Sequence, residues 1–134
     1  MKSSVEWIGG ERFVSRSESG HAVVMDGDSE SGCAPTPMEM LLMSAGSCAS
    51  VDVVSIMEKA RQDLRECQVQ LSGQRADATP AVFAEIRLHF ILRGENLSEK
   101  HAERAVRLSV EKYCSVASSL HPDIRIEHSF ELQS

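Results

Sequence analysis

The sequence predicts an α+β protein in which helices lie against an antiparallel sheet. Short strand patterns with glycine turns open the chain, and one long apolar helical pattern follows them. Strand and helix patterns then alternate without the regular β-α-β repeat of a doubly wound fold. The chain of 134 residues fits a single domain, 1–134, which is long enough to bury a core without disulfides.

Three short strand patterns open the chain, at residues 5–8, 12–17 and 21–26. Gly9-Gly10 separates the first two and Gly20 precedes the third. Glycine pairs between runs of β-branched and aromatic residues are typical of hairpins, so we expect an antiparallel meander.

A long helix is predicted to begin after Thr36. Thr36 and Glu39 have the spacing of a capping box, in which each residue satisfies the other's free backbone N–H. Gly46 and Ser47 are expected to interrupt the helix, so that Cys48 would begin a second helical segment. The free N–H groups at such a start favour a thiolate. The alternative is that Cys48 is one of several small residues that let helices pack closely.

The second half of the chain shows strands, a helix and a final strand. Residues 67–71 and 86–92 alternate apolar and polar side chains, with a hairpin loop at 76–80 between them. Ser98 opens a helix over 99–113, and the last strand covers 124–132. We expect these strands to complete the antiparallel sheet.

Composition excludes several classes of function. The formal net charge of −6 argues against a general nucleic-acid binder, which needs a basic face. No apolar run approaches the ~20 residues of a membrane span, and the N-terminus lacks a signal-peptide pattern. We therefore expect a soluble, cytoplasmic protein with no nucleic-acid or membrane partner.

The four cysteines, Cys33, Cys48, Cys67 and Cys114, are the main candidates for chemistry. None belongs to a CxxC pair or stands at zinc-ligand spacing from a histidine, so no metal site is predicted. Cys67 lies on the apolar face of a strand, and Cys33 lies in a polar loop. Cys48 and Cys114 are candidate reactive thiols, although each could instead be a core residue at its helix.

Other polar candidates have plain structural interpretations. Glu39 is the capping-box residue, and Arg12 and Arg16 fit the solvated face of a hairpin. His128, on the apolar face of the last strand, is interpreted as a core histidine with a partner rather than as a base.

Three segments carry a resemblance to a known family: APTPMEMLL at 34–42, AGSC at 45–48 and KYCSVA at 112–117. In this order and spacing they resemble the OsmC-like family, which comprises osmotically inducible protein C and the organic hydroperoxide resistance proteins. The similarity covers essentially the whole chain and is strongest to the family's YhfA-like branch.

The resemblance implies an intertwined homodimer and a thiol peroxidase that reduces organic hydroperoxides without metal or other cofactor. Cys48 matches the peroxidatic cysteine and Cys114 the resolving cysteine. The family's arginine on an early strand corresponds to Arg12 or Arg16. Its glutamate corresponds to Glu39, which stands one position later than the family's usual Asn-Pro-Glu spacing.

The implied mechanism oxidises Cys48 to a sulfenic acid, which Cys114 converts to a disulfide that a dithiol reductant reopens. Two other functions remain open. The dimer could bind a small apolar ligand with the thiols as spectators, or its disulfide could report oxidant to a partner protein.

Overall fold

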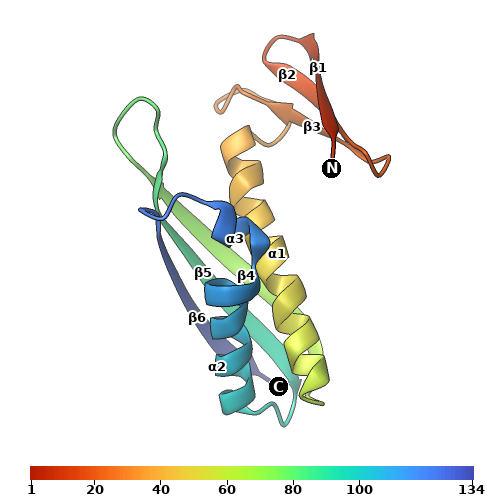
Figure 1. Cartoon of the computed structure of the whole chain (residues 1–134), viewed down its shortest axis with the longest axis vertical. Coiled ribbons are helices and arrows are strands. Elements are labelled where there is room, and N and C mark those ends of the chain that lie inside the picture. Colours follow the sequence, from red (N-terminus) through yellow and green to blue (C-terminus); the bar gives the residue numbers. More distant parts are fainter. The chain divides into compact units, whose positions relative to one another are not determined.

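The computed structural model describes residues 1–134, and its internal contacts divide the chain into two units, residues 1–41 and 42–134. The elements run in the order β1-β2-β3-α1-β4-β5-α2-η1-α3-β6 (Figure 1). Strands β1, β2 and β3 form one sheet, and strands β4, β5 and β6 form another. The α+β class is therefore confirmed.

The first unit contains the predicted meander. Strands β1 (Ser3–Gly9), β2 (Arg12–Ser17) and β3 (Ala22–Asp26) pair antiparallel in chain order. Gly9 and Gly10 have φ angles of +111° and +58° at the first turn. Side chains with a Cβ rarely adopt these angles, which explains the glycine pair.

This first sheet leaves most of its apolar side chains uncovered. Asp26 is the only buried residue among residues 1–41. The exposed large apolar side chains of this unit are Met1, Val5, Trp7, Ile8, Phe13, Val23 and Val24. A three-stranded sheet with its apolar side chains in water lacks the burial that usually stabilises such a unit.

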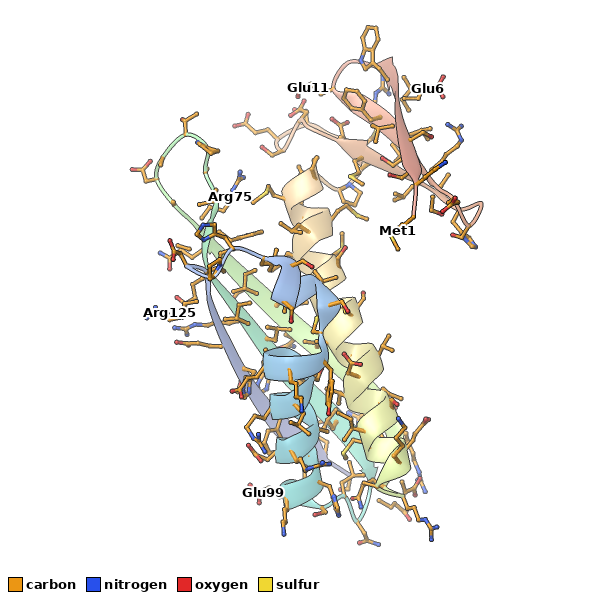
Figure 2. All side chains as sticks on the ribbon, in the orientation of Figure 1. Met1, Glu6, Glu11, Arg75, Glu99 and Arg125 are labelled. Carbon is orange, nitrogen blue, oxygen red and sulfur yellow. The ribbon has the colours of Figure 1, made fainter.

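The second unit places helices over one face of a sheet. The sheet consists of β4 (Asp63–Arg75), β5 (Phe83–Glu95) and β6 (Arg125–Gln133). In Figure 1, α1 and α2 (Glu99–Leu108) run along the same face of this sheet. Figure 2 shows Glu99, the first residue of α2, and Arg75, the last residue of β4, at opposite ends of the unit.

The core lies between this sheet and the helices. Ile86, Leu88, Phe90 and Leu92 of β5 are at most 3% exposed and alternate with the polar or partly exposed residues of the outer face. Helix α2 faces them with two alanines and one valine, Ala102, Ala105 and Val106, each at 0% exposure. The alternation predicted for residues 86–92 is confirmed.

The last strand pairs differently from the expectation. Strands β4 and β5 are antiparallel, but β5 and β6 are parallel. The helices between β5 and β6 cross over the sheet, so the chain re-enters the sheet at the same end and runs in the same direction. The sheet is therefore mixed, and the prediction of an entirely antiparallel sheet is wrong for β5 and β6.

Helix α1 (Pro37–Lys59) is continuous, so the predicted interruption at Gly46 and Ser47 is wrong. A Cβ on Gly46 would lie 2.5 Å from Cδ1 of Leu71, a residue of β4. The glycine therefore permits a close approach of helix and strand, rather than ending the helix.

By length and composition, α1 is the one helix that is long and apolar enough to cross a membrane. The sequence predicted no segment of this kind. Five of its residues, Ala45, Gly46, Ala49, Val53 and Met57, are buried. Such a buried stripe is typical of a core helix, and Met43 and Val51 of α1 remain exposed.

The predicted helix over 99–113 changes its geometry before it ends. Helix α2 stops at Leu108, and residues Ser109–Tyr113 form one π-helical turn, η1. After Cys114 a short helix, α3 (Ser115–Ser119), begins. Single π turns inside helices occur frequently at functional sites.

Candidate functional site

The thiols of Cys48 and Cys114 meet in the second unit. Cys48 lies in the middle of α1 and is half-buried, whereas Cys114 follows η1 and is 0% exposed. Their side chains are near enough that Cys48 raises the pKa of the Cys114 thiol. The fold thus brings together the two cysteines selected as candidate reactive thiols.

Several backbone groups hold Cys114 in place. Its N–H donates to the carbonyl oxygen of Ser109 at 2.8 Å, which closes the π turn. Its Sγ accepts from the N–H of Ala117 at 3.4 Å, because Cys114 is the N-cap of α3. The same sulfur lies 3.9 Å from the carbonyl oxygen of Ala45 in α1.

The environment keeps Cys114 protonated. Burial is the main cause that raises the pKa of the Cys114 thiol. The N–H of Ala117 acts in the opposite direction, while the hydrogen bond to Cys48 and the charge of the Cys48 thiolate raise this pKa further. The Cys114 thiol therefore resists deprotonation in the resting protein.

Cys48 does not begin a helix. It follows eleven residues of the continuous helix α1, counted from Pro37. The helix-terminus argument for a thiolate at Cys48 is therefore wrong, because free N–H groups occur only in the first turn. The feature that distinguishes Cys48 is its proximity to the Cys114 thiol, whose pKa it raises.

The other two thiols lie apart from this pair. Cys67 is on the inner face of β4, where burial raises the pKa of its thiol and a hydrogen bond with Ser50 opposes that rise. Cys33 is exposed, and its Sγ lies 3.7 Å from Oδ2 of Asp26. The structural interpretation of Cys67 and the exposure of Cys33 are confirmed.

Glu39 forms the predicted capping box. Its Oε1 accepts from the N–H of Thr36 at 3.0 Å, and its own N–H donates to Oγ1 of Thr36 at 3.1 Å. The hydrogen bond from the Thr36 N–H holds the pKa of the Glu39 carboxyl below its usual range. Glu39 is therefore ionised and already engaged at the start of α1.

The two candidate arginines are also engaged within the first unit. Arg16 forms an exposed ion pair with Glu6 at 3.1 Å. Arg12 donates from Nε to the carbonyl oxygen of Gly9 at 3.4 Å. Arg12, Arg16 and Glu39 all belong to residues 1–41, whereas the thiol pair belongs to residues 42–134, so their roles at the thiols remain predictions.

A groove of about 610 Å³ in the second unit is lined by residues of α1, α2 and η1, and neither Cys48 nor Cys114 lines it. Its lining includes Asp52, one helical turn after Cys48, and Tyr113, which precedes Cys114. Ile56 and Leu108 give it an apolar part, and its cationic side chains are Lys59 and Arg104. A groove of this size and mixed lining can hold a small organic molecule.

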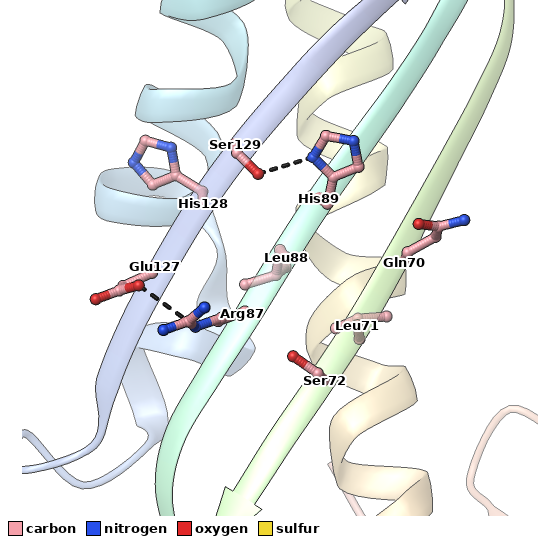
Figure 3. A pocket seen from close by; sticks show the side chains of 9 residues that line it. All are labelled: Gln70, Leu71, Ser72, Arg87, Leu88, His89, Glu127, His128 and Ser129. Carbon is pink, nitrogen blue, oxygen red and sulfur yellow. Dashed lines mark hydrogen bonds and ion pairs between the residues drawn. The ribbon is translucent and has the colours of Figure 1, made fainter.

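A second hollow, of about 450 Å³, lies on the polar strand face of the same unit (Figure 3). There His89 joins β5 to β6, with its Nδ1 2.7 Å from Oγ of Ser129 and its Nε2 3.1 Å from Oε1 of Glu131. These contacts cross-link neighbouring strands on an open surface. No cysteine lines this hollow.

The remaining histidine of interest is explained by its partner. His128 lies on the inner side of β6, and its Nε2 is 3.2 Å from Oε1 of Glu111 in η1. The prediction of a partnered histidine is confirmed.

No group of three or more His, Cys, Asp or Glu side chains has a geometry that could hold a metal ion.

Sequence reasoning missed Ser109. Its side chain is 0% exposed, and its Oγ donates to the carbonyl oxygen of Ala49 at 2.5 Å. The available signal was a serine on the apolar stripe of the helix, between Val106 and Val110. A buried hydroxyl requires a hydrogen-bond partner, and periodicity alone does not identify that partner.

The fold and the two thiols define a small α+β protein in which a cysteine of the long helix α1 lies near a cysteine that follows η1. The model of the OsmC-like protein family matches residues 27–129, so the chain belongs to the OsmC-like family. It is 48% identical over 132 residues to Protein YhfA of Escherichia coli K12, with 98% of each chain covered. The predicted family and branch are confirmed.

Solved structures agree with this assignment. A hypothetical protein from Aquifex aeolicus VF5 is 34% identical with a TM-score of 0.87, over 98% of this chain and 95% of that one. An organic hydroperoxide resistance protein from Elizabethkingia anophelis has a TM-score of 0.72 at 14% identity, over 98% of this chain and 94% of that one. The second likeness shows a shared fold.

Proposed function

We propose that this protein is a thiol-dependent peroxidase that reduces organic hydroperoxides through Cys48 and Cys114. The observation that carries the proposal is the proximity of a half-buried and a fully buried thiol, near enough that Cys48 raises the pKa of Cys114. The fold is also shared with proteins named for organic hydroperoxide resistance. The proposed site needs no cofactor or metal, because sulfur itself is oxidised and reduced.

In the first step the Cys48 thiolate attacks the outer oxygen of the hydroperoxide. The O–O bond breaks, Cys48 becomes a sulfenic acid, and the released alkoxide takes a proton to leave as the alcohol. Cys48 suits this role because it is the more accessible of the two sulfurs.

In the second step Cys114 attacks the sulfenic sulfur of Cys48, and a disulfide and water form. Oxidation of Cys48 to the neutral sulfenic acid removes two of the causes that raise the pKa of Cys114, the thiolate charge and the hydrogen bond to it. The Ala117 N–H continues to favour the Cys114 thiolate. Cys114 thus becomes a better nucleophile after Cys48 has reacted.

A dithiol reductant completes the cycle. One of its thiolates attacks the Cys48–Cys114 disulfide, and its second thiol resolves the mixed disulfide, so that the reductant leaves oxidised and both protein thiols return. Such exchange requires a reducing compartment, and we expect the protein to act in the cytoplasm.

The surroundings of Cys48 favour an organic hydroperoxide over hydrogen peroxide. Met43 and Val51 are exposed apolar residues of α1, on either side of Cys48 in the sequence. The groove of the same unit, which begins at Asp52 one helical turn after Cys48, adds the apolar side chains of Ile56 and Leu108. An alkyl group gains free energy by burial against such residues, whereas hydrogen peroxide has none to bury.

We further propose that the protein works as a homodimer. The uncovered apolar side chains of the first sheet, among them Trp7 and Phe13, and those of α1 exceed what a monomer normally leaves in water. An intertwined partner of the same sequence would cover them. Arg12 or Arg16, oriented by Glu39, would then supply the positive charge that stabilises the Cys48 thiolate.

The test is consumption of an organic hydroperoxide by single variants in the presence of a dithiol. Cys48→Ser should abolish consumption. In a parallel assay without dithiol, Cys114→Ser should reduce one equivalent per subunit and then accumulate sulfenic or sulfinic acid at Cys48, because no resolving sulfur remains. Cys33→Ser and Cys67→Ala are the matched controls and should retain turnover.

Mass spectrometry of the oxidised protein decides between the alternatives. The proposal requires a Cys48–Cys114 disulfide after treatment with hydroperoxide. A disulfide through Cys33 or Cys67, or no oxidation at Cys48, would refute it. A Cys48–Cys114 disulfide that forms without sustained turnover would favour a redox sensor instead.

A further inference from the structure

We infer that Ser109 is a positioning residue, which holds Cys114 against Cys48 through hydrogen bonds on both sides. The inference rests on the proposed function in one respect, namely that Cys48 and Cys114 act as a redox pair. It adds a residue that does not touch the substrate and does not itself react.

The side chain of Ser109 is tied to the helix that carries Cys48. Its Oγ donates to the carbonyl oxygen of Ala49, the residue directly after Cys48, at 2.5 Å. Ser109 is 0% exposed and Ala49 is 1% exposed, so water does not compete for this bond. Hydrogen bonds in such an environment hold their partners more firmly than those at the surface.

The backbone of Ser109 is tied to Cys114. Its carbonyl oxygen accepts from the N–H of Cys114 at 2.8 Å, the bond that closes the π turn. One residue thus links the carbonyl next to Cys48 with the amide of Cys114. Together with the contact between the thiols, these bonds close a ring through Cys48, Ala49, Ser109 and Cys114.

Packing alone does not account for a serine at this position. The neighbouring inward positions of the same stripe hold Ala102, Ala105, Val106 and Val110. An alanine at position 109 would bury no polar group and would favour the helix more strongly than serine. The hydroxyl is explained by its hydrogen bond to α1, which fixes the distance between α1 and the turn that ends at Cys114.

This distance matters for disulfide chemistry because the bond tolerates little displacement. The Cα atoms of a disulfide must lie about 4.4–6.8 Å apart, and a misplacement of about 1 Å can cost a reacting pair about a hundredfold in rate. A loosened π turn would let Cys114 move away from Cys48. The effective concentration of one thiol at the other would then fall.

The experiment measures the equilibrium between dithiol and disulfide in glutathione buffers of fixed pH, for Ser109→Ala and a matched core control, Val106→Ala. All proteins carry Cys33→Ser and Cys67→Ala, so that only the pair can react. Val106 is also 0% exposed and lies one turn earlier on the same stripe, but its side chain forms no hydrogen bond. Urea titration reports the loss of stability in each variant.

Ser109→Ala should lower the equilibrium constant for disulfide formation about tenfold, which raises the reduction potential by about 30 mV. Val106→Ala should leave the potential unchanged even if it costs more stability. An unchanged potential in Ser109→Ala, a more stable disulfide, or an equal shift in both variants would overturn the inference, because the serine would then serve packing alone.

Glutathione replaces the hydroperoxide in this experiment, so the two proposals fail separately. If the unsubstituted pair forms its disulfide in glutathione but consumes no hydroperoxide, the proposed peroxidase function fails and the assignment of Ser109 is still tested. If hydroperoxide is consumed but Ser109→Ala leaves the potential unchanged, only the assignment of Ser109 fails.

Discussion

Gly46 offers a quantitative test of how α1 packs against β4. A Cβ built on Gly46 would lie 2.5 Å from Cδ1, 3.2 Å from Cδ2 and 3.3 Å from Cγ of Leu71. Because three atoms of one side chain are too close, Leu71 must change its rotamer or the helix must move. Overpacking of this kind costs about 1–3 kcal/mol.

A second effect acts in the opposite direction. Alanine is favoured over glycine inside a helix by about 1 kcal/mol. Gly46→Ala should therefore lower the free energy of unfolding by about 1 kcal/mol net, although alanine is the better helix former. In a Leu71→Ala background the overpacking disappears, and the same substitution should stabilise the protein by up to about 1 kcal/mol.

The assay is a double-mutant cycle measured by urea unfolding at one fixed protein concentration, since stability of a dimer depends on concentration. The expected coupling between positions 46 and 71 is at least about 1 kcal/mol. If Gly46→Ala stabilised the protein equally in both backgrounds, the close approach of α1 and β4 would not be the reason for the glycine.

Three further predictions concern accessibility, acid stability and assembly. Cys67 should be alkylated more slowly than Cys48 at neutral pH, because burial raises the pKa of the Cys67 thiol; equal rates, read cysteine by cysteine by mass spectrometry, would contradict this. Arg87 and then Arg125 hold the pKa of Glu85 below its usual range. The stabilisation from Glu85 is therefore fully present above the ordinary carboxyl pKa, and it is lost as the pH falls through the lowered pKa of Glu85. Glu85→Gln should thus lower the free energy of unfolding at pH 7, and it should lower it progressively less in acid. Light scattering should give the mass of a dimer, and a monomer mass independent of concentration would refute the proposed assembly.

The parts of the fold that the sequence predicted depend on local rules. The alternation of Ile86, Leu88, Phe90 and Leu92 reflects a strand with one buried face, and that face is buried. The capping box between Thr36 and Glu39 requires only residues within one helical turn, and both of its hydrogen bonds form. Patterns of this kind need no knowledge of distant contacts.

The predictions that proved wrong depend on contacts between distant residues. Gly46 has two opposite interpretations, a break in the helix or a close approach, and only the position of Leu71 decides between them. The direction of β6 depends on the crossover of the helices after β5, because alternation is the same in parallel and antiparallel strands. The wrong interpretation of Gly46 also affected the prediction of the site, because it placed Cys48 at the start of a helix.

The site itself shows why the right cysteines were selected for a partly wrong reason. The expected source of reactivity was the end of a helix next to Cys48, but the structure offers the second thiol instead. Burial raises the pKa of the Cys114 thiol, and the nearby Cys48 raises it further. In the proposed mechanism, the difference in burial between the two thiols fixes their order of reaction. The accessible sulfur of Cys48 would meet the oxidant first, and the buried sulfur of Cys114, whose position the hydrogen bonds of Ser109 and Ala117 define, would react second.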